Sequence, residues 1–362
     1  MMDLLDWVAQ EHAKPLAGFR APLMTGAIAL TVTYFLTPFV RSLAIRKGVI
    51  DDPKSDDRRV HTEPTPRWGG LAIFVGIAAA LAVVLPFAFP LNPFPRYLQA
   101  MLVASLLIVV MGALDDLYQF RASVQALFLL TIGVCVQYWF GDAGRVQIPG
   151  MGNPLAAEGG WIDFGWAAVP ITAIYLFVVT KTMDTIDGID GLAAGIAAIA
   201  GGTLSVIATY FVLDSNPQRA AELGRALWQD LPRIAIIAAA LAGAAIGFLK
   251  HNYNPAKIFM GTGGAQLLGF LLACLSIVGV MKTAAALALL VPVLVFGVPI
   301  VDAVNVVIRR LASRQPITQA DKRHLHHQLL ERGLTQRQAV WVLYLVALTL
   351  CGVLLVVVRL YG

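Results

Sequence analysis

The sequence predicts an all-α integral membrane protein with about ten transmembrane helices in a single domain, residues 1–362. Two observations predict this class. The chain is 58% hydrophobic and only 14% charged, with a mean hydropathy of +0.73, which is more apolar surface than a soluble domain of this length needs. Apolar runs near the length that crosses a bilayer also recur along the whole sequence. We therefore expect a bundle of membrane-spanning helices.

Ten apolar runs define the expected helices. We expect no cleavable signal peptide before them, because Asp3, Asp6 and Glu11 come before any apolar run. The eighth and ninth runs are separated only by the segment 281–283. In chain order the ten runs are 21–43, 69–90, 97–114, 122–140, 166–182, 189–213, 233–250, 264–280, 284–307 and 338–359.

Lysine and arginine predict the orientation of these helices. With ten spans, both termini lie on one side, and the loops after the odd-numbered spans lie on the other. The odd loops, with the adjoining span ends, hold 18 of the 27 Lys and Arg residues. Because such residues concentrate on the cytoplasmic side, we expect these loops in the cytoplasm and both termini outside. The odd loops are approximately 44–68, 115–121, 183–188, 251–263 and 308–337.

Every strongly polar cluster of the chain falls in an odd loop, and the first is Asp115-Asp116. These two residues close the third span. The C-terminal end of a helix carries partial negative charge, so two carboxylates there need something positive to offset them. A divalent cation, a basic side chain or a reacting proton would serve. The alternative is a solvated pair of acids at a helix end.

A second acidic cluster consists of Asp184, Asp187 and Asp190, spaced by three. On a helix this spacing puts all three carboxylates on one face. Oxygen ligands of this kind suit Mg²⁺, or Mn²⁺ as an alternative, and either ion also bridges diphosphate oxygens. A surface turn rich in Asp and Gly is the competing interpretation.

Three further segments carry groups suited to phosphate. The stretch 252–264, with Asn252, Lys257 and Thr262, brings glycines immediately before a helix, where free backbone N–H groups can cradle phosphate. The loop 308–337 combines arginines, which bind phosphate with two parallel hydrogen bonds, with histidines that can donate protons. The residues of that loop are Arg309, Arg310, Arg323, His324, His326 and His327.

Both basic loops also have a simpler interpretation. The loop 308–337 could be only a positive-inside signal, although this does not account for three histidines in four residues. Arg59 and His61 in loop 44–68 could face a phosphate or could contact membrane lipid headgroups. The pI of about 9.2 suits anionic lipids and phosphorylated substrates. Nucleic acid is not an expected partner, because no separate basic domain exists.

The motifs together resemble one family. The chain is similar to the polyprenyl-phosphate N-acetylhexosamine-1-phosphate transferases of bacterial membranes, over about Asp51 to Gly333 and in its ten-span layout. The His-Leu-His-His form resembles the branch that uses UDP-N-acetylglucosamine, whereas the branch that uses UDP-MurNAc-pentapeptide usually has an uninterrupted histidine triplet. The matching pieces are Asp115-Asp116, Asp187-Gly188-Ile189-Asp190-Gly191-Leu192, Asn252-x-x-Pro255-Ala256-Lys257-Ile258-Phe259-Met260-Gly261 and Asp321-x-x-His324-Leu325-His326-His327-x-Leu329.

The resemblance implies a reaction and a place. The phosphate of undecaprenyl phosphate would attack the β-phosphorus of UDP-N-acetylglucosamine, with Mg²⁺, to give sugar-diphospho-undecaprenol and UMP. The enzyme would lie in the bacterial plasma membrane with its active site at the cytoplasmic face, as a monomer or a homodimer.

The resemblance also implies roles. Asp115 and Asp116 would orient or deprotonate the lipid phosphate, Asp184 would bind Mg²⁺, and Asp187 and Asp190 would shape the nucleotide and metal site. Asp187 and His324 join the aspartate pair as expected catalytic residues. The expected substrate-binding residues are Asp190, Asn252, Lys257, Arg309, Arg310, Arg323, His326, His327, Arg59 and His61.

Several positions depart from the family pattern, and they leave alternatives open. Lys181 and Asp184 stand where the family usually has Asn, Gln119 where it often has Asp, and Thr262 where it normally has a metal-binding Asp. A neutral hydroxyl is a poorer Mg²⁺ ligand than a carboxylate. Either Asp184 compensates, or the chain binds metal weakly, or Thr262 is an engineered inactivating change.

Three alternatives to the main function therefore remain. They are a binding-only family member with an impaired metal site, a phospho-MurNAc-pentapeptide transferase, and a membrane transporter. Transporters keep ionisable groups near the middle of the bilayer, whereas the charges of this sequence lie at span ends or in loops.

Overall fold

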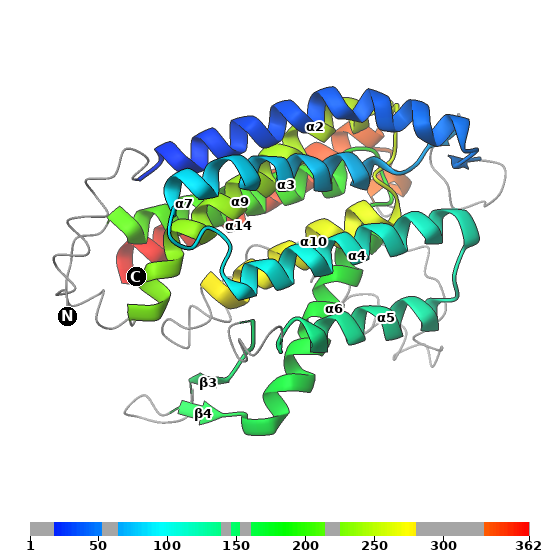
Figure 1. Ribbon diagram of the computed structural model, residues 1–362. Coiled ribbons are helices and arrows are strands. Elements are labelled where there is room, and N and C mark those ends of the chain that lie inside the picture. Colours follow the sequence, from blue (N-terminus) through cyan, green and yellow to red (C-terminus); the bar gives the residue numbers. More distant parts are fainter. Residues whose placement is uncertain are drawn as a thin grey trace.

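The computed structural model describes residues 18–52, 64–138, 146–152, 161–213, 225–279 and 329–361. Within these ranges the chain is almost entirely helical, as Figure 1 shows. This confirms the prediction of an all-α, multi-pass membrane protein. The helices are α2 (Arg20–Arg46), α3 (Gly69–Ala88), α4 (Arg96–Tyr118), α5 (Ala122–Cys135), α6 (Ala168–Ile186), α7 (Leu192–Leu213), α9 (Arg225–Asn252), α10 (Gly261–Gly279) and α14 (Gln336–Tyr361).

Two short antiparallel strand pairs connect helices. The pair β1 (Ile50–Asp51) and β2 (Thr65–Pro66) lies between α2 and α3, with Ile50 opposite Pro66. The pair β3 (Gly150–Gly152) and β4 (Trp161–Asp163) precedes a single turn, η3 (Gly165–Ala167), which leads into α6. Each pair is a separate two-stranded sheet within a connection between helices.

Eight helices in the described part of the chain are long and apolar enough to cross a bilayer. They match eight of the ten expected runs, and the ninth run, 284–307, lies outside the described residues. The fourth run, 122–140, was predicted too long. Its helix α5 ends at Cys135 after 14 residues, because the chain turns at Val136–Tyr138. At 1.5 Å per residue it covers roughly 21 Å of a hydrocarbon core that is roughly 30 Å thick.

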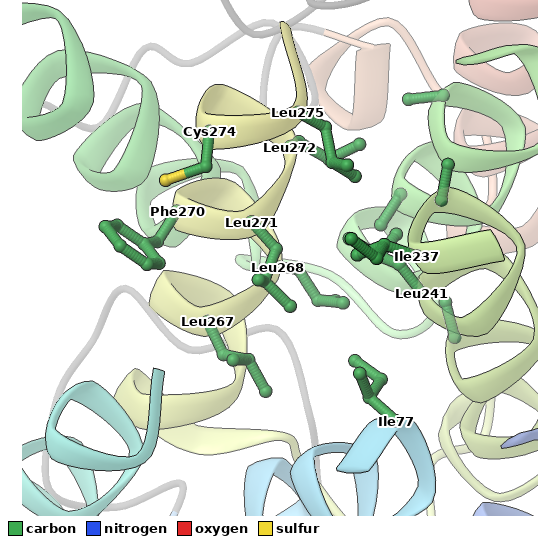
Figure 2. Close-up of a cluster of buried hydrophobic side chains, with 14 of the residues drawn as sticks. Ile77, Ile237, Leu241, Leu267, Leu268, Phe270, Leu271, Leu272, Cys274 and Leu275 are labelled. Carbon is green, nitrogen blue, oxygen red and sulfur yellow. The ribbon is translucent and has the colours of Figure 1, made fainter. Parts of the chain in front are cut away.

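Helix α10 is the centre of the bundle. It packs against α3, α4, α6, α7 and α9, and nearly all of its residues are buried. Figure 2 shows its leucines, among them Leu268 and Leu271, facing Ile77 of α3 and Ile237 of α9. The apolar side chains of α10 are enclosed by the other helices. The position of α10 in the bundle therefore fixes where the loop before it, residues 253–260, lies.

Small residues bring α2 and α9 into close contact. A Cβ atom on Gly243 would lie 2.0 Å from the carbonyl oxygen of Gly26, and one on Gly247 would lie 2.4 Å from that of Leu30. Glycines four residues apart on a membrane helix let two backbones approach in this way. The sequence thus favours a tight α2–α9 pair along one side of the bundle (Figure 1).

The helices place their polar ends together. The ends of α4, α6 and α9 and the starts of α3, α5, α7, α10 and α14 are joined there by hydrogen bonds between loops. Helix α2 begins and α14 ends at the opposite end of the bundle (Figure 1). The described clusters that the sequence predicted to share one face therefore do meet at one end of the molecule, namely 115–116, 184–190 and 252–264. Most of loop 308–337 lies outside the described residues.

Candidate active site

The floor of the candidate site is formed by two loops that pair through their backbones. The N–H groups of Gly69 and Gly70 donate to the carbonyls of Phe259 and Met260, at 3.0 and 2.8 Å, and the N–H of Phe259 donates to Pro66 at 2.8 Å. This pairing sets the start of α3 beside the start of α10. It also holds residues 261–264 against the last turns of α4.

Asp116 lies in the last turn of α4, and its side chain is only 2% exposed. One carboxylate oxygen is 3.5 Å from a guanidinium nitrogen of Arg67 and 3.4 Å from the N–H of Thr262. Gly261 has a positive φ of 72°, and a Cβ there would lie 2.2 Å from the other carboxylate oxygen. Only glycine combines this backbone conformation with this approach, so position 261 serves the placement of Asp116.

Asp115 has a different environment from its neighbour. Its Oδ1 accepts hydrogen bonds from the N–H of Phe120 and from the side-chain amide of Gln125, both at 2.9 Å. These contacts close the turn between α4 and α5. In the structure Asp115 holds a turn, while Asp116 faces the loop that begins α10. The role toward the lipid phosphate that was expected of both aspartates stays a prediction.

Asp184 lies in the last turn of α6. Its Oδ2 is 2.5 Å from Nζ of Lys181 and 3.4 Å from the side-chain amide of Gln266 on α10. Its side chain is 16% exposed, and neither contact uses Oδ1. Asp184 can therefore present one oxygen to a ligand while the other is held.

The expectation that Asp184, Asp187 and Asp190 share one helical stripe is wrong. Helix α6 ends at Ile186, and Asp187 is its C-cap with a non-helical ψ of 38°. The reason is the pair of glycines at 188 and 191, the second with a positive φ of 84°, which allow a turn before α7. The three carboxylates consequently project from a helix end and a turn.

The carboxyl group of Asp187 lies among other acids. Desolvation is the largest cause that raises its pKa well above the ordinary value. The neighbouring carboxylates, first that of Asp184 and then those of Asp190 and Asp116, raise this pKa further, and the Arg67 guanidinium lowers it. Asp116, Asp184 and Asp187 thus lie close enough for their charges to interact. We call these three residues the carboxylate cluster.

Asp190 and Asn252 hold the loops that surround the cluster. Oδ2 of Asp190 accepts from the side-chain amide of Asn254 at 3.0 Å and from the N–H of Ala256 at 2.9 Å. The Asn252 side chain receives the N–H of Gly191 at 3.1 Å and donates to the carbonyl of Ile258 at 3.0 Å. The contact of Asp190 and Asn252 with substrate stays a prediction. Lys257, which was also expected to bind substrate, is exposed beside them.

Helix α14 fastens the same two loops from the C-terminal part of the chain. The Tyr344 hydroxyl donates to the carbonyl of Gly191 at 2.6 Å. At the start of α14, Gln336 accepts from Asn254 at 2.6 Å, and Arg337 donates to the Asn254 carbonyl at 3.2 Å. The acidic turn is therefore held by a helix more than 140 residues away in the sequence.

Several residues of this site were not singled out from the sequence. Arg67 lies in the basic loop 44–68, of which only Arg59 and His61 were singled out, yet it bridges Asp116 and, at 2.9 Å, Asp51. Gln125 and Gln266 carry no charge and no motif, and Tyr344 lies within an apolar run, so nothing in the sequence distinguished them. The expected residues outside the described part are Arg59, His61, Arg309, Arg310, Arg323, His324, His326 and His327.

A divalent cation would find hard oxygen ligands at the carboxylate cluster. Among the described residues, no group of three or more His, Cys, Asp or Glu is arranged to hold a metal ion by itself. Mg²⁺ usually takes one or two carboxylates, several waters and the phosphates of a substrate, so the chemistry of the cluster fits that ion. Thr262 contributes its backbone N–H to Asp116 and adds no charge.

The sequence profile of Glycosyl transferase family 4 matches residues 98–280. A probable undecaprenyl-phosphate N-acetylglucosaminyl 1-phosphate transferase of Bacillus subtilis is 34% identical over 88% of this chain and 80% of that protein.

Two further relatives differ in their named activity. The decaprenyl-phosphate N-acetylglucosaminephosphotransferase of Mycolicibacterium smegmatis is 34% identical over 90% of this chain and 79% of its own length. A phospho-N-acetylmuramoyl-pentapeptide-transferase of Moorella thermoacetica is 27% identical over 91% of this chain and 97% of its own. The matched segment contains the carboxylate cluster and the whole of α10, and the chain is a member of glycosyl transferase family 4.

Proposed function

We propose that this protein transfers N-acetylglucosamine-1-phosphate from UDP-N-acetylglucosamine to undecaprenyl phosphate. A phosphate oxygen of the lipid attacks the β-phosphorus of the nucleotide sugar. The bond from that phosphorus to the oxygen bridging the two phosphates breaks, and UMP leaves with the bridging oxygen. The observation that carries the proposal is the convergence of Asp116, Asp184 and Asp187 where helix ends meet, in a chain 34% identical to a relative named for this activity.

The carboxylate cluster suits phosphoryl transfer because such reactions depend on positioning and on neutralising charge. Asp116, held by Arg67 and the N–H of Thr262, would orient or deprotonate the lipid phosphate. Asp184 and Asp187 would hold Mg²⁺, which when bound neutralises the charge of the diphosphate. Lys257 at the rim and the basic loop 308–337, with His324, would bind the nucleotide sugar.

The distribution of Lys and Arg supports a location for the reaction. Basic residues concentrate in the loops that carry the site, so the site would face the cytoplasm of a bacterial cell and both termini would face outside. The lipid acceptor would reach the carboxylate cluster from the surrounding membrane. A transporter is disfavoured, since the described carboxylates of the site lie at helix ends rather than in the middle of spans.

The phospho-MurNAc-pentapeptide reaction is the second candidate. It shares the phosphoryl chemistry and is named for relatives that are 26% and 27% identical to this chain. The relatives named for N-acetylglucosamine reach 34%. The two candidates differ in the group on the sugar and not in the role of the carboxylates, so a choice of donor substrates separates them.

The decisive experiment measures UMP release by the purified full-length protein in detergent with undecaprenyl phosphate. We expect release with UDP-N-acetylglucosamine that depends on both the lipid and Mg²⁺ and that stops when a chelator is added. UDP-N-acetylgalactosamine and UDP-MurNAc-pentapeptide are the matched donors. Release with the pentapeptide donor alone would assign the second candidate, and binding without release from any donor would identify a binding-only protein.

A further inference from the structure

Lys181 is a cation placed directly against the carboxylate cluster. Its Nζ is 2.5 Å from Oδ2 of Asp184, one turn further along α6, and 2.8 Å from Oε1 of Gln125 on α5. The side chain is 37% exposed, so its charge is partly solvated. Two acceptors from two helices nevertheless converge on this one ammonium group.

The contacts of Lys181 extend into a chain of hydrogen bonds across four helices. The amide of Gln125 accepts from Lys181 through its oxygen and donates through its nitrogen to Asp115 of α4 at 2.9 Å. The held oxygen of Asp184 also accepts from Gln266 of α10. The two donors that meet at Oδ2 of Asp184 come from two different helices, which fixes the rotamer of Asp184.

The position of the ammonium has an electrostatic consequence. Among the described residues, Asp184 is the charge that acts most strongly on Asp187, and Arg67 is the basic side chain that offsets this negative charge. Lys181 neutralises Asp184 by direct contact, and it does so with a compact point charge that cannot be displaced without breaking its bond to Gln125.

We propose that Lys181 is a built-in counter-ion of the carboxylate cluster and a positioning residue for Asp184. It holds one oxygen of Asp184 toward α5 and α10 and leaves the other for a divalent cation. The positive charge also weakens the binding of that cation, so the cluster is tuned to take Mg²⁺ together with a diphosphate rather than alone. This inference rests on the proposed function for the identity of the cation and on the described contacts for everything else.

The test measures Mg²⁺ binding in the absence of substrates, so it does not depend on transferase activity. The purified full-length protein is titrated with Mg²⁺, and the shift in thermal denaturation midpoint gives the apparent affinity. Lys181→Met removes a positive charge next to the ion, and we expect binding to tighten by about tenfold. Lys181→Gln removes the charge but keeps a donor for Asp184, and it should tighten binding in the same direction.

Two controls make the result specific. Lys181→Arg keeps the charge and should bind Mg²⁺ like the unmodified protein. Arg359→Met removes one positive charge from an exposed position at the far end of α14, and it should leave the titration unchanged. An equal response to Mg²⁺ in both uncharged Lys181 variants and the unmodified protein, or no response in any of them, would overturn the proposal. Weaker Mg²⁺ binding in the uncharged variants would overturn it as well.

Discussion

Both ends of the helical bundle contain a buried carboxylate near an arginine, but the two ends are built differently. At the far end, Asp230 on α9 lies 3.6 Å from Arg233, one turn later, and accepts the Tyr97 hydroxyl at 3.3 Å. Arg233 donates to the carbonyl of Asn92 and stacks 4.0 Å from the ring of Phe89. This arrangement joins α9 to the connection between α3 and α4.

At the site end, the described basic side chains do not neutralise every acid of the carboxylate cluster, whereas at the far end one arginine faces one aspartate. Arg67 is divided between Asp51 and Asp116, and Lys181 contacts only Asp184 among the acids. The pKa of Asp187 is raised as a result of desolvation and of this excess of negative charge. Removing one partner of a paired charge costs stability, whereas a cluster with excess negative charge can accept a cation or a substrate.

The largest expected effect is a loss of activity when a carboxylate at the site end is changed. Asp116→Asn keeps the shape of the side chain and removes its charge, and we expect UMP release to fall by roughly 100-fold or more. The thermal midpoint should change little. Near-normal turnover in this variant, measured on protein with an intact midpoint, would remove Asp116 from the reaction and weaken the contrast between the ends.

The second effect concerns stability at the far end. Asp230→Asn removes the negative charge 3.6 Å from the largely enclosed guanidinium of Arg233, and we expect a loss of up to about 3 kcal/mol in stability. The turnover of the protein that remains folded should be unchanged. Thermal denaturation and UMP release are measured on the same sample. If turnover per folded molecule falls as far as in Asp116→Asn, the two ends are coupled and the comparison fails.

The third prediction sharpens the comparison within the site. Asp115→Asn keeps an oxygen that can accept from Phe120 and Gln125 but replaces charge-assisted hydrogen bonds with neutral ones. We expect a stability loss of about 1 kcal/mol and a fall in turnover smaller than that of Asp116→Asn. Equal losses of turnover in the two variants would return both aspartates to the shared role that the sequence suggested.

The smallest effect is expected at the helix that fastens the acidic turn. Tyr344→Phe removes the hydrogen bond to the Gly191 carbonyl and keeps the ring, which packs so closely that a Cβ on Gly195 would lie 2.0 Å from it. We expect a loss of about 1 kcal/mol in stability and a modest fall in turnover. Thr349→Val, which removes a hydroxyl bonded within an exposed turn of α14, is the matched control and should change neither quantity.

The sequence alone determined the class of the protein and pointed to the acidic residues that meet at one end of the bundle. Long apolar runs have few stable solutions in a bilayer, since every backbone polar group must be satisfied within a helix, so nine of ten runs could be recognised in the described helices. The aspartates of α4 and of the turn before α7 stood out because charge at the edge of a membrane span is rare. Their meeting at one end followed from counting spans.

Only the tertiary structure decided what each of these residues contacts. Asp115 and Asp116 are adjacent in the sequence, but successive residues on a helix point about 100° apart, so one faces the α4–α5 turn and the other faces α10. Asp190 holds Asn254, and Lys181 holds Asp184 toward Gln125, through contacts between segments far apart in the chain. Such partners carry no local signal, because a hydrogen bond depends on where two side chains meet and not on the residues beside them.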